Sequence, residues 1–320
     1  MLSNMSALPS DHSGGGGVAG TCTRRAFISK ASAAALGACA GASLPGFAAG
    51  LSACPIVVFS KVYQELNLSF EEAAALTAEA ELNGIDCPVR DGGEILPGRA
   101  VDDLPRYAEI LDRKQLKIHL LTSGITGVAS PHAEAILRSA RKLGVRYYRL
   151  GFFKPESGWP AGKQAREIRS ALKDVAAMNR EIGVCALFQN HSGSFGANLP
   201  DLREVVSEFD PAQVGVAFDI GHAILIHGDG WRSHFDALTS HLRVAYVKDA
   251  RHGASWVRFG EGDIARTGYF KRLQQLGYAA PFSLHIEFDW SEGGRSRSRE
   301  SLLRALRESR VVLQQWTDRV

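Results

Sequence analysis

Polar residues alternate with apolar ones in a short run near the carboxyl terminus. The segment Phe282-Ser283-Leu284-His285-Ile286-Glu287 has the period of two that is typical of a β-strand, whose successive side chains point to opposite faces. One face therefore carries Ser283, His285 and Glu287, and the apolar face is expected to pack against helices. Glu287 ends the polar face and is the strongest candidate in the sequence for a general base.

Two further apolar runs end in charged residues. In the run 214–219, small residues and then Asp219 share one face, while Val216 and Phe218 share the other. In the run 244–249, Tyr246 and Lys248 share a face. The ends of three predicted strands thus carry two acidic side chains and one basic side chain.

Strands and helices alternate from residue 55 onward. Eight short β-branched or apolar runs are expected as strands at residues 56–60, 84–89, 117–122, 147–152, 184–189, 214–219, 244–248 and 282–287. Apolar residues at helical spacing predict helices at 69–82, 102–114, 131–143, 164–182, 199–209, 231–241, 264–276 and 299–314. Ser69 and Glu72 match a capping box at the first helix. Eight such units predict a single (β/α)8 TIM barrel, an α/β fold whose active sites lie at the carboxyl ends of the strands.

Five short motifs occur in order at the predicted strand ends. They are Gln189-Asn190-His191, Phe218-Asp219-Ile220-Gly221-His222, Val247-Lys248-Asp249, Gly260-Glu261-Gly262 and His285-Ile286-Glu287. This ordered set resembles the xylose isomerase-like barrel superfamily of sugar phosphate isomerases and epimerases, over about residues 55–315. The Gly260-Glu261-Gly262 motif is expected to shape the loop after the seventh strand.

The resemblance implies a divalent metal site in which two of four ligands are changed. Members of the superfamily usually hold the cation with a Glu, an Asp, a His and a Glu on strands five to eight. Asp219 and Glu287 match, whereas Gln189 and Tyr246 replace the first Glu and the His. Gln189, Asp219 and Glu287 are the remaining metal candidates, and oxygen ligands favour Mg or Mn. The alternative is a metal-free pocket in which Lys248 supplies the positive charge, and no nucleotide cofactor is expected.

The reaction implied by the resemblance is proton transfer next to a carbonyl of a carbohydrate or keto-sugar. Glu287 is the expected base, with Lys248 and His222 as further catalytic candidates. Gln189 cannot accept a proton, which disfavours an epimerisation with two bases. A proton shift between aldose and ketose ranks first, and elimination of water, as in a sugar or cyclitol dehydratase, remains open.

Other polar residues near the predicted strand ends are candidates for substrate binding. They could hydrogen-bond sugar hydroxyls or stack on a sugar ring, or they could equally be satisfied core or loop residues. The candidates are Arg90, His119, Arg149, His191, Trp256 and His285.

Two rival functions belong to other classes. The same barrel superfamily includes endonucleases that bind three zinc ions, but this chain lacks their density of His and Glu ligands. The formal net charge of +3 gives no basic stripe for a phosphate backbone, so nucleic acid is not an expected partner. The second rival is a non-catalytic carbohydrate-binding barrel that has lost part of its metal site.

The first 48 residues are expected to be a leader, followed by the barrel domain at 49–320. Thr23-Arg24-Arg25-Ala26-Phe27-Ile28 and the Ala-rich run after it resemble a twin-arginine export signal. The apolar run is too short for a stable transmembrane segment, so a periplasmic protein cleaved near Ala48 is expected. Lipid anchoring at Cys39 is the alternative. The mature Cys54, Cys87 and Cys185 are odd in number and are expected to be buried thiols.

Overall fold

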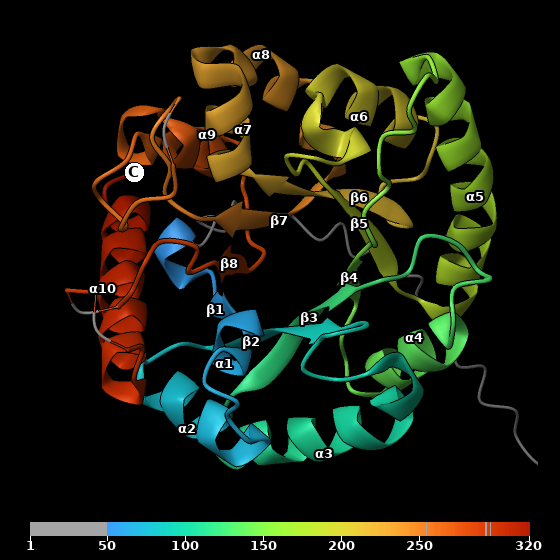
Figure 1. The fold of residues 1–320 in the computed structure, drawn as a ribbon. Coiled ribbons are helices and arrows are strands. Elements are labelled where there is room, and N and C mark those ends of the chain that lie inside the picture. The colour runs from blue at the N-terminus through green and yellow to red at the C-terminus, as the bar shows by residue number, and fades with distance from the viewer. Residues whose placement is uncertain (1–49, 254, 292, 295) are drawn as a thin grey trace, which may run out of the picture. The chain divides into compact units, whose positions relative to one another are not determined.

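Eight parallel strands close into a barrel in which each strand pairs with its neighbours in sequence, and β1 pairs with β8. Figure 1 shows the strands at the centre of a ring of helices. The strands are β1 (Ile56–Phe59), β2 (Gly84–Val89), β3 (Lys117–Ser123), β4 (Tyr147–Arg149), β5 (Cys185–Gln189), β6 (Val214–Asp219), β7 (Leu242–Val247) and β8 (Phe282–Leu284). The predicted (β/α)8 barrel is therefore confirmed.

This computed structural model describes residues 50–253, 255–291, 293–294 and 296–320. The predicted leader 1–48, with its twin-arginine pattern and Cys39, lies outside the described residues. None of the described helices is long and apolar enough to cross a membrane.

Helices follow the strands at the eight predicted places. They are α2 (Phe70–Glu79), α3 (Ala100–Asp112), α4 (Ala133–Lys142), α5 (Ala161–Ile182), α6 (Leu199–Val206), α8 (Trp231–Asp236), α9 (Tyr269–Gln275) and α10 (Arg299–Asp318). The capping box at Ser69 and Glu72 is present, with each side chain bonded to the backbone of the other residue. At the seam of the ring, α10 lies against α2, and Arg307 donates to the carbonyl of Glu79.

The structure adds short elements, most of which lie outside the helices predicted from the sequence. They are the helices α1 (Lys61–Gln64) and α7 (Ile220–His227) and the 3-10 turns η1 (Leu51–Ala53), η2 (Pro97–Arg99), η3 (Phe195–Ala197), η4 (Gly228–Gly230), η5 (Thr239–His241) and η6 (Ile264–Arg266). The helix predicted at 264–276 starts later than expected, because Gly268 adopts a left-handed φ of 70° between η6 and α9.

β4 and β8 are three residues shorter than predicted, but their chains continue alongside their neighbours. The amide of Leu150 still donates to Leu187, and the amide of His285 donates to Val247. Side chains beyond the formal strand ends therefore keep the alternation of the strand.

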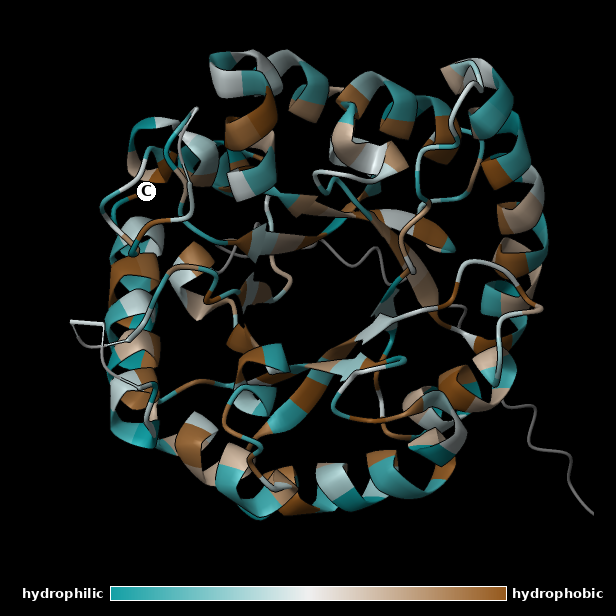
Figure 2. Cartoon of the chain, in the orientation of Figure 1, coloured by the Kyte–Doolittle hydropathy of each residue, from teal (hydrophilic) through white to brown (hydrophobic). Residues whose placement is uncertain are grey.

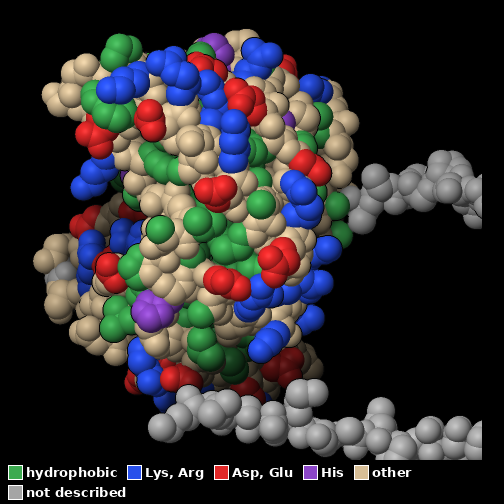
Figure 3. Space-filling view, turned by 90° about the vertical axis from the view of Figure 1, so that its right-hand side faces the viewer, with side chains coloured by type: hydrophobic (Ala, Val, Ile, Leu, Met, Phe, Trp, Pro, Cys, Tyr) green, Lys and Arg blue, Asp and Glu red, His purple; other side chains and the backbone are tan. Residues whose placement is uncertain are grey.

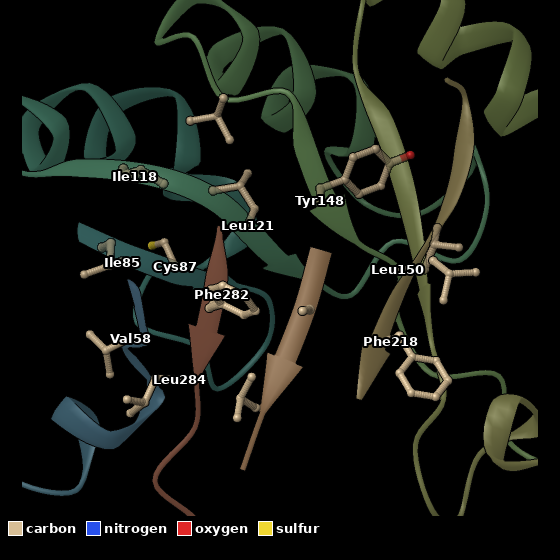
Figure 4. Close-up of a cluster of buried hydrophobic side chains, with 14 of the residues drawn as sticks. Val58, Ile85, Cys87, Ile118, Leu121, Tyr148, Leu150, Phe218, Phe282 and Leu284 are labelled. Carbon is tan, nitrogen blue, oxygen red and sulfur yellow. The ribbon is translucent and has the colours of Figure 1, made fainter. Parts of the chain in front are cut away.

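Two apolar layers fill the space on either side of the sheet. Outward-facing residues such as Val58, Leu121, Phe218 and Leu284 form the larger layer, against the helices (Figure 4). Inward-facing residues form the smaller layer inside the barrel: Val57, Leu120, Cys185, Leu187, Ala217, Val244 and Tyr246. Burying each large side chain stabilises the fold by about 1.5–3 kcal/mol. The helices carry their hydrophobic residues on the side of the sheet (Figure 2).

The cysteines lie in the core, and charged side chains lie on the surface. Cys54, Cys87 and Cys185 are free and buried, as predicted, and burial raises the pKa of each thiol. On the face toward α5, acidic and basic side chains are interspersed with hydrophobic ones (Figure 3).

Candidate functional site

A cavity of about 90 Å³ opens at the carboxyl ends of the barrel strands. Larger hollows exist elsewhere, such as a groove of about 1000 Å³ beside the amino ends of β4 and β5. Active sites of this fold lie at the carboxyl ends, which favours the smaller cavity. Its walls combine aromatic, basic and amide side chains with one carboxylate: Phe59, Lys61, Arg90, Thr122, Arg149, Phe152, Gln189, His191, Tyr246, Lys248, His285 and Glu287.

A buried ion pair lies beneath one wall of the cavity. Lys248 Nζ is 3.1 Å from Asp219 Oδ2, and the two side chains are 4% and 0% exposed. Gln189 donates from its amide nitrogen to the same Oδ2, at 2.9 Å. The other oxygen of Asp219 accepts the backbone N–H of His222 and so caps the start of α7. Both oxygens of Asp219 are therefore bound by donors from this chain.

Lys248 is held from its other side by an indole ring. Its Nζ lies 4.8 Å from the ring centroid of Trp256, a cation–π distance. Gly221 packs so close that a Cβ at that position would lie 2.4 Å from the carbonyl oxygen of Lys248. The position of the ammonium group is thus set by Asp219, Trp256 and the start of α7.

Two histidine rings lie against each other beside this pair, tilted by 53°. The rings of His191 and His222 are 4.0 Å apart, and His191 also contacts Phe152 at the mouth. Burial and the charge of Lys248 lower the pKa of both imidazoles. The amide of Ser192 donates to Nδ1 of His222, so the neutral ring carries its hydrogen on Nε2, which has no hydrogen-bond partner among the described residues and lies 3.9 Å from Asp219 Oδ2.

Glu287 follows β8, which pairs with β7, the strand that ends just before Lys248. Its carboxylate is 3.9 Å from Lys61 Nζ, and the two side chains are 26% and 46% exposed. It is the one carboxylate among the residues that line the cavity. Glu287 is therefore placed where it could exchange a proton with a bound molecule.

A second buried acid, which sequence reasoning missed, is bonded to the cavity residue Thr122. Asp86 on β2 accepts hydrogen bonds from Thr122 at 2.8 Å and from Ser283 at 3.0 Å. Burial raises the pKa of this carboxyl to about 6. A signal existed, because Asp86 lies four residues before Arg90, and the period of two places both, with Pro88 between them, on the same strand face.

Two polar atoms at the inner wall have no hydrogen-bond partner among the described residues. They are the hydroxyl of Tyr246 and Nδ1 of His285, whose rings are 4.6 Å apart. Burial and nearby Asp86 raise the pKa of Tyr246 far above its usual range, so the phenol stays protonated. Burial and Lys248 lower the pKa of His285, so that ring is neutral.

The structure brings most of the sequence-predicted residues to this cavity. Those that line it are Arg90, Arg149, Gln189, His191, Lys248, His285 and Glu287. Asp219, His222 and Trp256 do not line it, but each contacts a residue that does or lies directly behind one. His222 is therefore a positioning residue here and not one that touches the cavity.

His119 is placed elsewhere, contrary to the prediction that it binds substrate. It lies near the start of β3, where its Nε2 is 3.3 Å from the carbonyl oxygen of Asn83. It lines an outer groove beside α3. Leu120 and Thr122 occupy the inward face of β3, so strand alternation turns His119 toward the helices.

The loop after β7 is organised as its glycines predicted. Asp249 Oδ2 accepts the backbone N–H groups of Gly260 and Gly262, at 2.9 and 3.0 Å. A Cβ on Gly262 would lie 2.2 Å from Asp249 Oδ1, so only glycine leaves room for this carboxylate. The loop returns Trp256 to the side of Lys248.

The sequence profile of the xylose isomerase-like TIM barrel family matches residues 74–309. The chain belongs to this family. The match spans seven of the eight strands and every residue of the cavity that lies between Arg90 and Glu287. A comparison with curated proteins found no match.

Solved structures of similar fold are distant in sequence. A xylose isomerase-like TIM barrel protein from Mycobacterium smegmatis, in complex with magnesium, has a TM-score of 0.63 and 12% identity over 84% of this chain and 99% of that chain. The probable 3-DHS dehydratase of petrobactin synthesis from Bacillus anthracis gives 0.62 and 13%, over 81% and 98%. The 3-keto-D-glucoside 4-epimerase from E. coli gives 0.56 and 15%, over 79% and 98%. At such identities the likeness establishes the fold.

The residues of this xylose isomerase-like barrel do not form the predicted metal site. Gln189, Asp219 and Glu287 were the candidate ligands, but Gln189 turns a nitrogen toward Asp219, and a lysine ammonium occupies the other approach to the same oxygen. A cation there would meet the positive charge of Lys248 at close range. No cluster of three or more His, Cys, Asp or Glu side chains suited to a metal occurs among the described residues.

Proposed function

We propose that this protein is a sugar isomerase- or epimerase-like enzyme that moves a proton next to a carbonyl of a carbohydrate or keto-sugar. The observation that carries the proposal is that Glu287 and Lys248 line one cavity. A carboxylate that can take a proton and an ammonium that can stabilise a developing oxyanion are the two groups such a reaction needs. The twin-arginine pattern at Thr23–Ile28 supports export to the periplasm.

In the proposed reaction, Glu287 removes a proton from the carbon beside the substrate carbonyl. The electron pair of that C–H bond forms the C=C bond of an enediolate, and the former carbonyl oxygen carries the negative charge beside Lys248. Glu287 then returns the proton to the neighbouring carbon, while Lys248 moves a proton between the two oxygens. Atoms and charge balance without an added reactant.

The unpaired polar atoms of the inner wall support a hydroxylated substrate. The Tyr246 hydroxyl and His285 Nδ1 are buried without hydrogen-bond partners among the described residues. An unsatisfied buried polar group costs about 1–3 kcal/mol. A sugar hydroxyl bound in the cavity would satisfy them, and this would add both affinity and orientation.

The test is proton exchange in deuterium oxide. The full chain is incubated with a panel of aldoses, ketoses and keto acids, and loss of the proton beside the carbonyl is followed by NMR. Glu287→Gln should reduce exchange by about 10²–10⁴-fold, the usual contribution of a general base. Glu261→Gln, in the exposed loop after β7, is the matched control and should exchange at the rate of the unchanged protein.

A second candidate function is carbohydrate binding without catalysis. It is favoured by one observation, namely that Lys248 pairs with Asp219 in place of a metal ion. Binding of a sugar without any exchange in deuterium oxide would support this candidate. Exchange that survives Glu287→Gln would remove the assignment of the base.

A further inference from the structure

Basic side chains outnumber acidic ones around the cavity. Its lining contains Lys61, Arg90, Arg149 and Lys248, against Glu287 alone. Two of these charges have partners, since Lys61 lies 3.9 Å from Glu287 and Lys248 lies 3.1 Å from Asp219. Arg90 and Arg149 are the two basic residues of the lining that are left without such a partner among the residues that the structure describes.

Arg149 is a deeply buried guanidinium without an ion-pair partner among the described residues. Arg149 is 2% exposed. One terminal nitrogen donates to the carbonyl oxygen of Leu150 at 2.5 Å, and the other reaches that of Ser123 at 3.5 Å. Both acceptors are neutral. The ring of Phe152, which is 39% exposed at the mouth, covers the guanidinium at 4.3 Å.

Arg90 lines the same cavity, and its side chain has no hydrogen bond or ion pair within the described part of the chain. Its guanidinium lies 5.8 Å from the ring centroid of Phe59. Burial lowers its pKa, and the charge of Arg90 acts against that of Arg149, whose pKa burial lowers to about 10. Asp86, which accepts hydrogen bonds from Thr122 and Ser283, forms no ion pair with either guanidinium, although its charge raises the pKa of both.

Both guanidinium groups line one cavity and no described carboxylate is bound to either, which is unfavourable unless a ligand supplies further negative charge. Burying an uncompensated cation costs several kcal/mol. The fork of N–H donors on arginine matches the paired oxygens of a carboxylate or phosphate. A volume of about 90 Å³ is far below the roughly 300–1,000 Å³ of a site for drug-sized ligands, so the bound group is small.

We propose that Arg90 and Arg149 form an anion site inside the cavity, so that the substrate carries a carboxylate or phosphate beside its reacting carbonyl region. This inference deepens the proposed function, because the anion would fix the substrate between Glu287 and Lys248. It names the substrate class as acidic sugars or small hydroxy-keto acids rather than neutral sugars. Phe152, which covers the guanidinium of Arg149, would close one side of this site.

The first test measures the melting temperature of the full chain in chloride, malonate and phosphate at equal ionic strength. The unchanged protein should melt at a higher temperature in malonate or phosphate, and Arg149→Met should remove this difference. A general salt effect would persist in Arg149→Met and would overturn the proposal, as would equal melting in all three salts. Arg166→Gln, an exposed arginine on α5, should keep the difference.

The same experiment separates ligand binding from a structural role of the arginine. If Arg149 holds the fold together, Arg149→Met should melt well below the unchanged protein in chloride. If it awaits an anion, removing the buried charge should leave melting in chloride unchanged or higher. Arg90→Gln tests the other guanidinium, which is at the more open position. This variant should also lose the higher melting temperature in malonate or phosphate.

The second test identifies the anion by calorimetry with D-fructose, D-fructuronate and D-fructose 6-phosphate. One of the charged sugars should bind at least about tenfold tighter than fructose, a difference of about 1.4 kcal/mol. Arg149→Met and Arg90→Gln should each remove that preference. If D-fructose bound as tightly as D-fructuronate and D-fructose 6-phosphate, the proposed substrate class would be wrong. Binding requires no proton transfer, so this result stands apart from any failure of the proposed reaction.

Discussion

The ammonium group of Lys248 lies 3.1 Å from Asp219 Oδ2, and both side chains are almost inaccessible to solvent. The pair occupies the place where the family pattern leads one to expect a metal ligand. Its energetics differ from those of a surface ion pair, because neither charge can return to water while the barrel is folded. The following two predictions rest on this contact.

Breaking the pair from one side should destabilise the fold strongly. Lys248→Met leaves Asp219 charged, buried and opposite an apolar group, which should lower the free energy of unfolding by about 3–5 kcal/mol. Adding Asp219→Asn should recover most of that loss, because no buried charge then remains. Chemical denaturation of the unchanged protein, the two single variants and the double variant measures the coupling free energy between Lys248 and Asp219. Lys61→Met, which removes a partly exposed partner of Glu287, is the control and should cost under about 1 kcal/mol.

Divalent metal should be unnecessary for stability. Chelation with EDTA is expected to leave the melting temperature unchanged, because Asp219 is already bound by Lys248, Gln189 and the amide of His222. Lys248→Ala frees one approach to Asp219, so added Mn²⁺ should raise the melting temperature of this variant and not that of the unchanged protein. A loss of stability on chelation of the unchanged protein would contradict this account.

The fold and much of the site could be predicted because alternation along a strand fixes which side chains face inward. Residues 282–287 show this, since His285 and Glu287 line the cavity while Phe282 and Leu284 pack outward. His119 shows the limit. Ile118, Leu120 and Leu121 place apolar residues on both faces of β3, so the sequence does not reveal which parity points inward.

Contacts between strands could not be predicted at all. The bonds of Asp86 to Thr122 and Ser283 depend on how β2 is placed against β3 and on which residues meet across the barrel. The pairing of Gln189 and Lys248 with one oxygen of Asp219 depends on side-chain rotamers as well. Residue types at strand ends therefore predicted a set of donors and acids, whereas the pairing of these groups is set by the folded structure.

Gly221 should be required for both stability and turnover. A Cβ there would meet Lys248 Cγ at 2.9 Å and Trp256 at 3.0 Å, so Gly221→Ala forces the lysine or the indole to move. Overpacking of this kind costs about 1–3 kcal/mol. A shifted ammonium should slow the proposed proton transfer by about tenfold or more. Denaturation and the exchange assay measure the two effects. Gly127→Ala, where nothing lies within 4 Å of the added carbon, should change neither.

Glu94 should make the protein less stable as pH rises. This carboxyl accepts hydrogen bonds from Ser60 and Tyr107, and burial raises its pKa from the ordinary 4.5 to about 7. The folded state therefore holds a proton that the unfolded chain releases above about pH 4.5. Between about pH 4.5 and pH 7 the folded state binds more protons, so the free energy of unfolding falls as pH rises and is level above pH 7.

Replacing Glu94 isolates this contribution. Glu94→Gln resembles the protonated acid, so it should match the unchanged protein near pH 4.5 and exceed its free energy of unfolding by on the order of 3 kcal/mol at pH 7.5. Denaturation at both pH values measures the difference. Glu72→Gln provides a control of opposite sign, because hydrogen bonds from Ser69 lower the pKa of Glu72. That variant should lose stability near neutrality and approach the unchanged protein in acid. A Glu94→Gln variant whose advantage is the same at both pH values would show that the carboxyl is ionised throughout, and the raised pKa would be wrong.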